Sequence, residues 1–232
     1  MSDAQHADHV LSRAPRRPAA VLWDMDGTLV DTEPYWMAAE IALVEQYGGT
    51  WSTEHANALV GNDLLVAAHY IREHGGVPLA PEEIVLRLLD GVIDRMQDHV
   101  PWRPGARQLL AELRRAGVPC ALVTMSWASL ARTFLDAVPH GTFSVVVTGD
   151  QVTRGKPHPE PYLHAARLLG VEPSEALAVE DSPTGVASAT AAGMPVLAVP
   201  HVLPVEEAAG RVVHPTLDGV DLAFLSGIFD SR

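Results

Sequence analysis

Residues 19–27 have the sequence Ala19-Ala20-Val21-Leu22-Trp23-Asp24-Met25-Asp26-Gly27. The apolar residues at its start form a run without polar alternation, which is typical of a strand buried on both faces of a sheet. The run ends abruptly in two aspartates and a glycine, a composition that favours a tight turn. The sequence therefore predicts a buried strand that delivers two carboxylates to one end of a sheet.

Further strands and helices alternate along the chain. Four more short apolar runs lie at 119–124, 143–148, 176–180 and 195–199. Segments with helical periodicity lie between or after them, at 105–116, 127–138, 160–169, 183–192 and 218–230. This alternation predicts an α/β protein with a doubly wound parallel sheet, in which ligands bind at the carboxyl ends of the strands. Ser182 and Pro183 fit the N-cap and the first turn of one of these helices.

The segment from 33 to 102 breaks the alternation, because it contains no convincing strand. Four candidate helices lie in it, at 34–47, 53–59, 63–74 and 81–99. We expect residues 33–102 to form an all-helical cap domain inserted into a core domain made of residues 19–32 and 103–232. Residues 1–18 carry prolines and arginines but no apolar stretch, and we expect a flexible tail there.

Composition limits the classes of function. The chain has 232 residues, 47% of them hydrophobic, which is enough for a sizeable core. Sixteen Lys and Arg against 29 Asp and Glu give a net charge of −13, which argues against a nucleic acid or an anionic membrane as the main partner. No apolar run is long enough to span a membrane. The single cysteine, Cys120, excludes an internal disulfide framework and fits a cytoplasmic protein.

Polar side chains stand where four of the predicted strands end. They are Asp24 and Asp26, Thr124, Lys156, and Glu180 with Asp181. Strand ends of a parallel sheet converge, and an excess of buried carboxylates is too costly without a cation. Oxygen ligands without His or Cys suit Mg²⁺. Lys156, the only lysine in the chain, and Thr124 would then hold a phosphoryl group together with backbone amides of the turn at 24–28.

The string Asp24-Met25-Asp26-Gly27-Thr28 resembles the first signature of the haloacid dehalogenase superfamily. Thr124, Lys156 and the string Glu180-Asp181-Ser182 are similar to its second, third and fourth signatures, in the same order. The inserted helices resemble the cap of the subgroup that contains β-phosphoglucomutases and small sugar phosphatases. The resemblance implies a Rossmann-like core and chemistry on phosphate esters.

The resemblance also implies a role for each matching residue. Asp24 would attack phosphorus and form an aspartyl-phosphate, and Asp26 would serve as acid and then base. The implied Mg²⁺ ligands are Asp24, the main-chain carbonyl of Asp26, Asp181 and Glu180. The implied phosphate-binding residues are Met25, Thr124, Met125 and Lys156, and the implied orienting residues are Thr28 and Ser182. In the cap, the positions expected to contact the leaving group are Trp36, Glu40, Asn62, Arg87 and Arg95.

Departures from the family pattern limit the reactions that the chain is expected to catalyse. Dehalogenases of this superfamily generally lack the second aspartate, which is present here as Asp26. Phosphonatases use a cap lysine, and the segment 33–102 contains none. β-Phosphoglucomutases carry a histidine and a lysine where this chain has Trp36 and Val60. We therefore expect a Mg²⁺-dependent phosphatase that acts on a small phosphorylated metabolite.

A sugar or polyol phosphate is the favoured substrate, with phosphoglycolate and nucleotide monophosphates left open. Two alternatives stay open as well: phosphoryl transfer of the β-phosphoglucomutase type, and a non-catalytic phosphate-binding scaffold.

Overall fold

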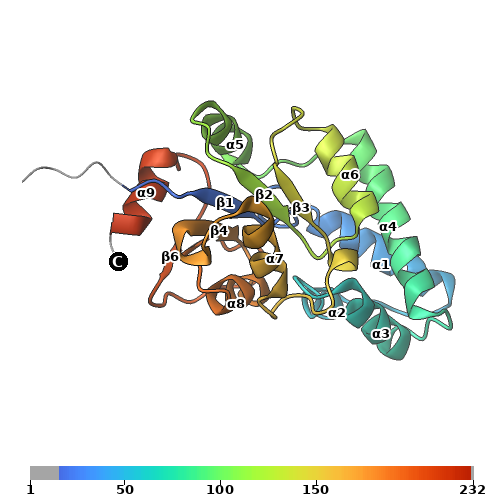
Figure 1. Cartoon of the computed structure of the whole chain (residues 1–232). Helices are drawn as coiled ribbons and strands as arrows, with labels where there is room; N and C mark the ends of the chain where they lie inside the picture. The colour runs from blue at the N-terminus through green and yellow to red at the C-terminus, as the bar shows by residue number, and fades with distance from the viewer. Residues whose placement is uncertain (1–15, 231–232) are drawn as a thin grey trace, which may run out of the picture.

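The computed structural model describes residues 16–230, and they contain a six-stranded parallel sheet (Figure 1). The strands are β1 (Ala20–Trp23), β2 (Cys120–Val123), β3 (Val145–Val147), β4 (Ala176–Glu180), β5 (Val196–Ala198) and β6 (Arg211–Val213). Their order across the sheet is β3-β2-β1-β4-β5-β6. In the register, Leu22 lies between Ala121 of β2 and Ala178 of β4. The chain order thus reverses between β1 and β4, which is where open α/β sheets bind ligands.

Helices cover both faces of the sheet. They are α5 (Ala106–Arg115), α6 (Ala128–Asp136), α7 (Glu160–Leu169), α8 (Pro183–Ala191) and α9 (Leu222–Asp230), with short 3₁₀ turns η1 (Gly149–Gln151) and η2 (Pro173–Glu175). Val21 and Trp23 of β1 pack in one buried cluster with residues of α5, α6 and α9. Ala20 and Leu22 point to the other face, where they pack with α7 and α8. The fully apolar run of β1 is therefore explained by burial on both faces, and the predicted fold class is confirmed.

The segment between β1 and α5 is helical, as the sequence indicated. It contains α1 (Glu33–Gln46), α2 (Thr53–Asn57), α3 (Leu64–His74) and α4 (Pro81–Asp98). The long helix α4 contacts α1 and α3 on one side and α6 of the sheet region on another (Figure 1). The division into core and cap domains at residues 32/33 and 102/103 stays a prediction.

Some predicted elements differ from the observed ones. Strand β6 was not predicted, because it contributes only Val212 and Val213 as apolar residues and is half-buried at the edge of the sheet. Helix α9 begins at Leu222 rather than 218, and α2 ends at Asn57 rather than 59. Residues 1–15 of the predicted tail lie outside the described residues. Within residues 16–230, no helix combines the length and apolar character that crossing a membrane requires.

Candidate active site

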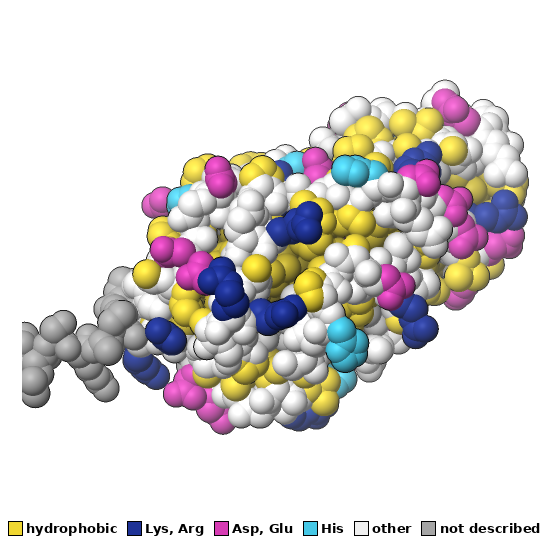
Figure 2. Space-filling model, turned by 90° about the horizontal axis from the view of Figure 1, so that it is seen from above, with side chains coloured by type: hydrophobic (Ala, Val, Ile, Leu, Met, Phe, Trp, Pro, Cys, Tyr) yellow, Lys and Arg dark blue, Asp and Glu magenta, His cyan; other side chains and the backbone are white. Residues whose placement is uncertain are grey.

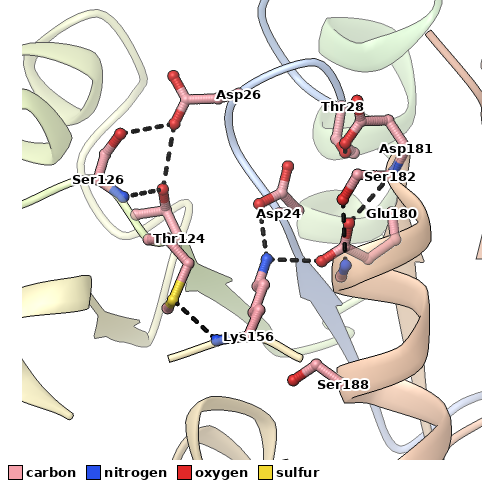
Figure 3. A network of polar contacts seen from close by, with 12 residues as sticks. Asp24, Asp26, Thr28, Thr124, Ser126, Lys156, Glu180, Asp181, Ser182 and Ser188 are labelled. Atoms are coloured by element: carbon pink, nitrogen blue, oxygen red, sulfur yellow. Dashed lines mark hydrogen bonds and ion pairs between the residues drawn. The ribbon is translucent and has the colours of Figure 1, made fainter. Parts of the chain in front are cut away.

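The ammonium group of Lys156 lies between two buried carboxylates (Figure 3). Its Nζ donates to Asp24 Oδ1 at 2.7 Å and to Glu180 Oε1 at 2.5 Å. Asp24 directly follows β1, Glu180 ends β4, and Lys156 lies in the connection from β3 to α7. Tyr162 of α7 donates its hydroxyl to the same Glu180 oxygen at 2.6 Å. The strand ends therefore converge as predicted, and they do so in a site that excludes water from the ion pairs.

A third carboxylate makes this cluster strongly acidic. Ligand atoms of Asp24, Glu180 and Asp181 lie within 4.8 Å of one another, and all three residues are buried. Asp24 Oδ2 is buried and has no hydrogen-bond partner among the residues that the structure describes. One ammonium cannot balance three carboxylates, so the cluster retains an uncompensated negative charge. A divalent cation with a preference for oxygen ligands fits this donor set.

The close approach of these carboxylates also shifts the pKa values of the residues in the cluster. Burial, together with the charges of Glu180 and Asp26, raises the pKa of Asp24 to about 7, although Lys156 opposes this rise in part. Burial and the charges of Asp24 and Glu180 raise the pKa of Asp181 well above its usual value. Burial alone would lower the pKa of Lys156, but the two adjacent carboxylates raise it above its ordinary range. Lys156 is therefore positively charged, and the site favours additional positive charge.

Asp26 is held separately from this cluster, by four hydrogen-bond donors. Its Oδ2 accepts from Thr124 Oγ1 at 3.2 Å and from Ser126 Oγ at 2.8 Å. Its Oδ1 accepts from Thr32 Oγ1 at 2.6 Å and from the Trp36 indole at 3.3 Å. In Figure 3 the Asp26 side chain is turned toward Thr124 and Ser126, away from Lys156. The two aspartates of the first loop thus have different surroundings, one buried beside a lysine and one held by neutral donors.

The turn directly after Asp26 requires a glycine. Gly27 has φ +83°, and a Cβ there would lie 2.1 Å from Asp181 Oδ2. Thr28 Oγ1 donates to the other oxygen, Asp181 Oδ1, at 3.3 Å. The first loop therefore packs directly on the carboxylate that follows β4, which fixes Asp181 beside Asp24.

Helix α8 also packs closely on the acidic cluster. Ser182 is its N-cap, with the side chain accepting from Gly185 N at 3.1 Å, as the sequence predicted. A Cβ on Gly185 would lie 2.0 Å from the Glu180 carboxylate. The small residue at this position thus makes room for Glu180 against the helix.

Residues of the helical segment close a narrow cavity over these groups. The cavity has a volume of about 70 Å³ and is lined by Asp24, Asp26, Thr124, Met125, Lys156, Asp181 and Ser182 from the sheet region. From the helical segment it is lined by Glu33, Trp36, Glu40, Asn62 and several apolar residues. Three of the predicted cap positions, Trp36, Glu40 and Asn62, therefore face the site.

Other predicted positions do not line the cavity. Arg87 is exposed and pairs with Glu83 at 3.2 Å, and Arg95 donates to the Gly91 carbonyl at 2.6 Å. Arg87 points away from the cavity because its neighbour Leu88 occupies the face of α4 that lines it, and Arg95 lies about two helical turns beyond Leu88. Met25 is fully buried and its side chain does not line the cavity, while the contact expected of it, through its backbone amide, stays a prediction.

Four residues at the site were not predicted from the sequence. Ser126 and Thr32 contact Asp26. Tyr162 contacts Glu180, and Glu33 lines the cavity. Ser126 could have been found, since it lies two residues after Thr124 on the same strand end. The contact of Tyr162 depends on how α7 packs, and no local pattern indicates it.

The chain is similar to known proteins in sequence and in fold. A family model described as haloacid dehalogenase-like hydrolase matches residues 21–199. Hexitol phosphatase A of Escherichia coli (strain K12) is 34% identical over 186 residues, which cover 77% of this chain and 81% of that protein. The probable pseudouridine-5'-phosphatase of Drosophila melanogaster is 34% identical over 194 residues, covering 80% of this chain and 83% of that protein. The crystal structure of CbbY from Rhodobacter sphaeroides in complex with phosphate matches with a TM-score of 0.81 and 28% identity, covering 90% of this chain and 99% of that one.

Glu40 supplies a pH-dependent test of the cavity wall. Burial raises its pKa from 4.5 to about 7, although Trp51 Nε1 donates to its Oε2 at 2.9 Å and lowers it in part. Between these two pH values folded Glu40 keeps a proton that the unfolded chain has lost. Its stabilising contribution is therefore complete below pH 4.5 and is lost as the pH rises through about 7. Glu40→Gln keeps an acceptor for Trp51 and does not titrate.

We expect Glu40→Gln to be more stable than the unmodified protein at alkaline pH, by up to about 3 kcal/mol, with the difference shrinking toward acidic pH. Urea unfolding at several pH values between 4.5 and 8.5 measures this. Glu45→Gln, at an exposed position of the same helix, is the matched control. If the free energies of unfolding of Glu40→Gln and the unmodified protein differed by the same amount across this pH range, the raised pKa of Glu40 would be contradicted.

Proposed function

Because the chain belongs to the haloacid dehalogenase-like hydrolases, we propose that it is a Mg²⁺-dependent phosphatase of small phosphorylated metabolites. The relatives named above as phosphatases support the reaction class. The observation that carries the proposal is the cluster of Asp24, Glu180 and Asp181 around a single ammonium group. This arrangement suits a cation and a phosphate dianion bound together, since each compensates the charge of the other.

Asp24 is the proposed nucleophile. Lys156 holds its Oδ1, and Oδ2 has no hydrogen-bond partner in the part of the chain that the structure describes, which leaves it available for attack. In the first step Oδ2 forms a bond to phosphorus, and the bond from phosphorus to the leaving alcohol oxygen breaks. In the second step water attacks the phosphorus of the aspartyl-phosphate, which returns the carboxylate and releases inorganic phosphate. Mg²⁺, when bound by Asp24 and Asp181, would stabilise the negative charge of the phosphoryl group.

Asp26 is the proposed acid and base. It gives a proton to the leaving alkoxide in the first step and takes one from the attacking water in the second. The donors Thr124 and Ser126 orient it from the sheet, while Thr32 and Trp36 orient it from the start of the helical segment. A non-catalytic phosphate-binding scaffold would not need such a positioned acid, so this geometry favours turnover.

The cavity wall favours a neutral, polyhydroxylated leaving group. Within the described residues, the helical segment contributes Glu33 and Glu40 to the cavity but no Lys, Arg or His side chain. Lys156, the cationic side chain in the lining, is already shared by two carboxylates. A second anionic group of a substrate would therefore find no cationic partner there, whereas hydroxyl groups can hydrogen-bond to Glu40 and Asn62. This supports a sugar or polyol phosphate over phosphoglycolate or a sugar bisphosphate, and hydrolysis over phosphoryl transfer through a bisphosphate.

Phosphate release with Asp24→Asn tests the reaction. We expect the unmodified protein to hydrolyse a hexitol 6-phosphate with Mg²⁺ and to lose this activity in EDTA. Asp24→Asn removes the nucleophilic carboxylate and is expected to lower kcat by at least about a thousandfold. Asp94→Asn, on the exposed side of α4, is the control and should keep normal activity. Normal phosphate release by Asp24→Asn would refute the proposed nucleophile.

Substrate preference tests the cavity wall. We expect kcat/KM for the hexitol 6-phosphate to exceed that for phosphoglycolate and for a hexose 1,6-bisphosphate by at least about tenfold, because the cavity wall offers a second anion no cationic partner. Burial raises the pKa of Glu40 to about 7 and that of Glu33 to about 8, so the preference should grow as the pH rises through this range and both side chains become charged. Glu33→Gln combined with Glu40→Gln should remove this growth. A steady-state comparison of the three substrates measures it. A preference for phosphoglycolate, or isomerised hexose phosphate formed faster than free phosphate, would overturn this substrate assignment.

A further inference from the structure

A second hollow lies away from the catalytic cavity and shares no lining residue with it. It has a volume of about 310 Å³ and lies between α5, Trp102 and the loop after α6. Figure 2, which views the molecule from the side of α5, shows a hollow with a yellow apolar floor bordered by dark-blue basic side chains. The lining residues are Trp102, Arg107, Leu110, Ala111, Arg114, Arg115, Ala137, Val138, Pro139 and Thr142.

The floor of this hollow is apolar and well anchored. Leu110 is buried, and the Trp102 ring packs against Phe134 with ring centroids 5.4 Å apart. The loop wall is fixed by Thr142, whose hydroxyl donates to the Pro139 carbonyl at 2.6 Å. A volume of this size, with a preformed apolar floor, is in the range of sites that hold one small molecule.

The rim is positively charged, although the chain carries a net charge of −13. Arg107, Arg114 and Arg115 are exposed, and none of them has an ion pair among residues 16–230. The Arg107 guanidinium lies over the Trp102 ring, 5.5 Å from its centroid. Among residues 16–230, no carboxylate lines the hollow. Three guanidinium groups therefore face a hollow that offers them no counter-charge.

The positions of these arginines along α5 are informative. Arg114 and Arg115 lie in the last turn, where cations are favoured by the helix dipole. Arg107 lies in the first turn, where the dipole disfavours a cation, so the dipole cannot account for it. All three share one face of α5 with Leu110 and Ala111, and it is this face that lines the hollow.

We propose that this hollow binds a small organic anion that has an apolar body. The aromatic or aliphatic body lies on Leu110, Val138 and the Trp102 ring, and a carboxylate, sulfonate or phosphate group lies among the three arginines. Arginine presents several donors in a fixed plane, which suits such anions, and it also stacks on aromatic rings. The proposal is independent of the catalytic assignment, because the two sites share no residue.

The probe for this test is 8-anilinonaphthalene-1-sulfonate, whose fluorescence reports binding and whose sulfonate and rings match both parts of the hollow. We expect saturable binding of one probe per chain. N-phenyl-1-naphthylamine has the same rings without the sulfonate, and it should bind at least about tenfold more weakly.

Two variants assign the binding to this hollow. Arg107→Gln combined with Arg114→Gln should weaken probe binding by at least about tenfold, which corresponds to about 1.4 kcal/mol. Ala111→Trp should fill the hollow and abolish binding. Arg132→Gln, an exposed arginine of α6 outside the hollow, is the matched control and should bind normally.

Several outcomes would overturn the proposal. They are the absence of saturable binding, equal binding by the double arginine variant, and equal binding of the uncharged probe. Circular dichroism of each variant checks its folding, and the double arginine variant tests the proposal even if Ala111→Trp does not fold.

Discussion

The ammonium group of Lys156 holds the strand ends of this protein together. It binds Asp24 from β1 and Glu180 from β4, the two strands between which the order of the sheet reverses. Both partners are buried, so each charge depends on the others for compensation. Asp181 adds a carboxylate for which this arrangement holds no second ammonium. The excess negative charge at one point is costly for the fold and is what prepares the site for a cation and a phosphate group.

The backbone around the cluster leaves room for the buried carboxylates. Gly27 and Gly185 stand where any side chain would overlap Asp181 or Glu180. Gly61, in the loop between α2 and α3, comes so close to Ser182 that a Cβ there would lie 2.8 Å from its Oγ. The helical segment thus rests directly on the start of α8, next to the acidic residues that end β4. This contact encloses the cavity, and exclusion of water strengthens the electrostatic interactions inside it.

The sequence alone predicted the features that depend on local pattern. Apolar runs that end in Asp24, Thr124 and Glu180 indicated the buried strands, and the topology of a parallel sheet then brought their ends together. Lys156 also indicated the site, because it is the only lysine in a chain whose other basic residues of this class are arginines, and it follows the end of a predicted strand. These predictions required no knowledge of side-chain direction.

The residues that sequence reasoning misplaced or missed depend on how elements rotate and pack. Arg87 and its neighbour Leu88 differ by one position, yet only Leu88 faces the cavity, because successive residues of a helix point about 100° apart. Tyr162 reaches Glu180 only because α7 packs across β1, β2 and β3. Strand β6 forms because it pairs with β5. The composition of a three-residue segment does not indicate such a pairing.

Thermal unfolding with and without Mg²⁺ tests the central claim, the uncompensated charge at Asp24, Glu180 and Asp181, most directly. We expect Mg²⁺ to raise the Tm of the unmodified protein, by an amount equivalent to about 2.7 kcal/mol at a concentration one hundred times its dissociation constant. Asp181→Asn should raise the Tm in the absence of Mg²⁺, since it relieves repulsion, and should remove the response to Mg²⁺. An unmodified protein that does not respond to Mg²⁺, together with an Asp181→Asn variant of lower Tm, would contradict the account.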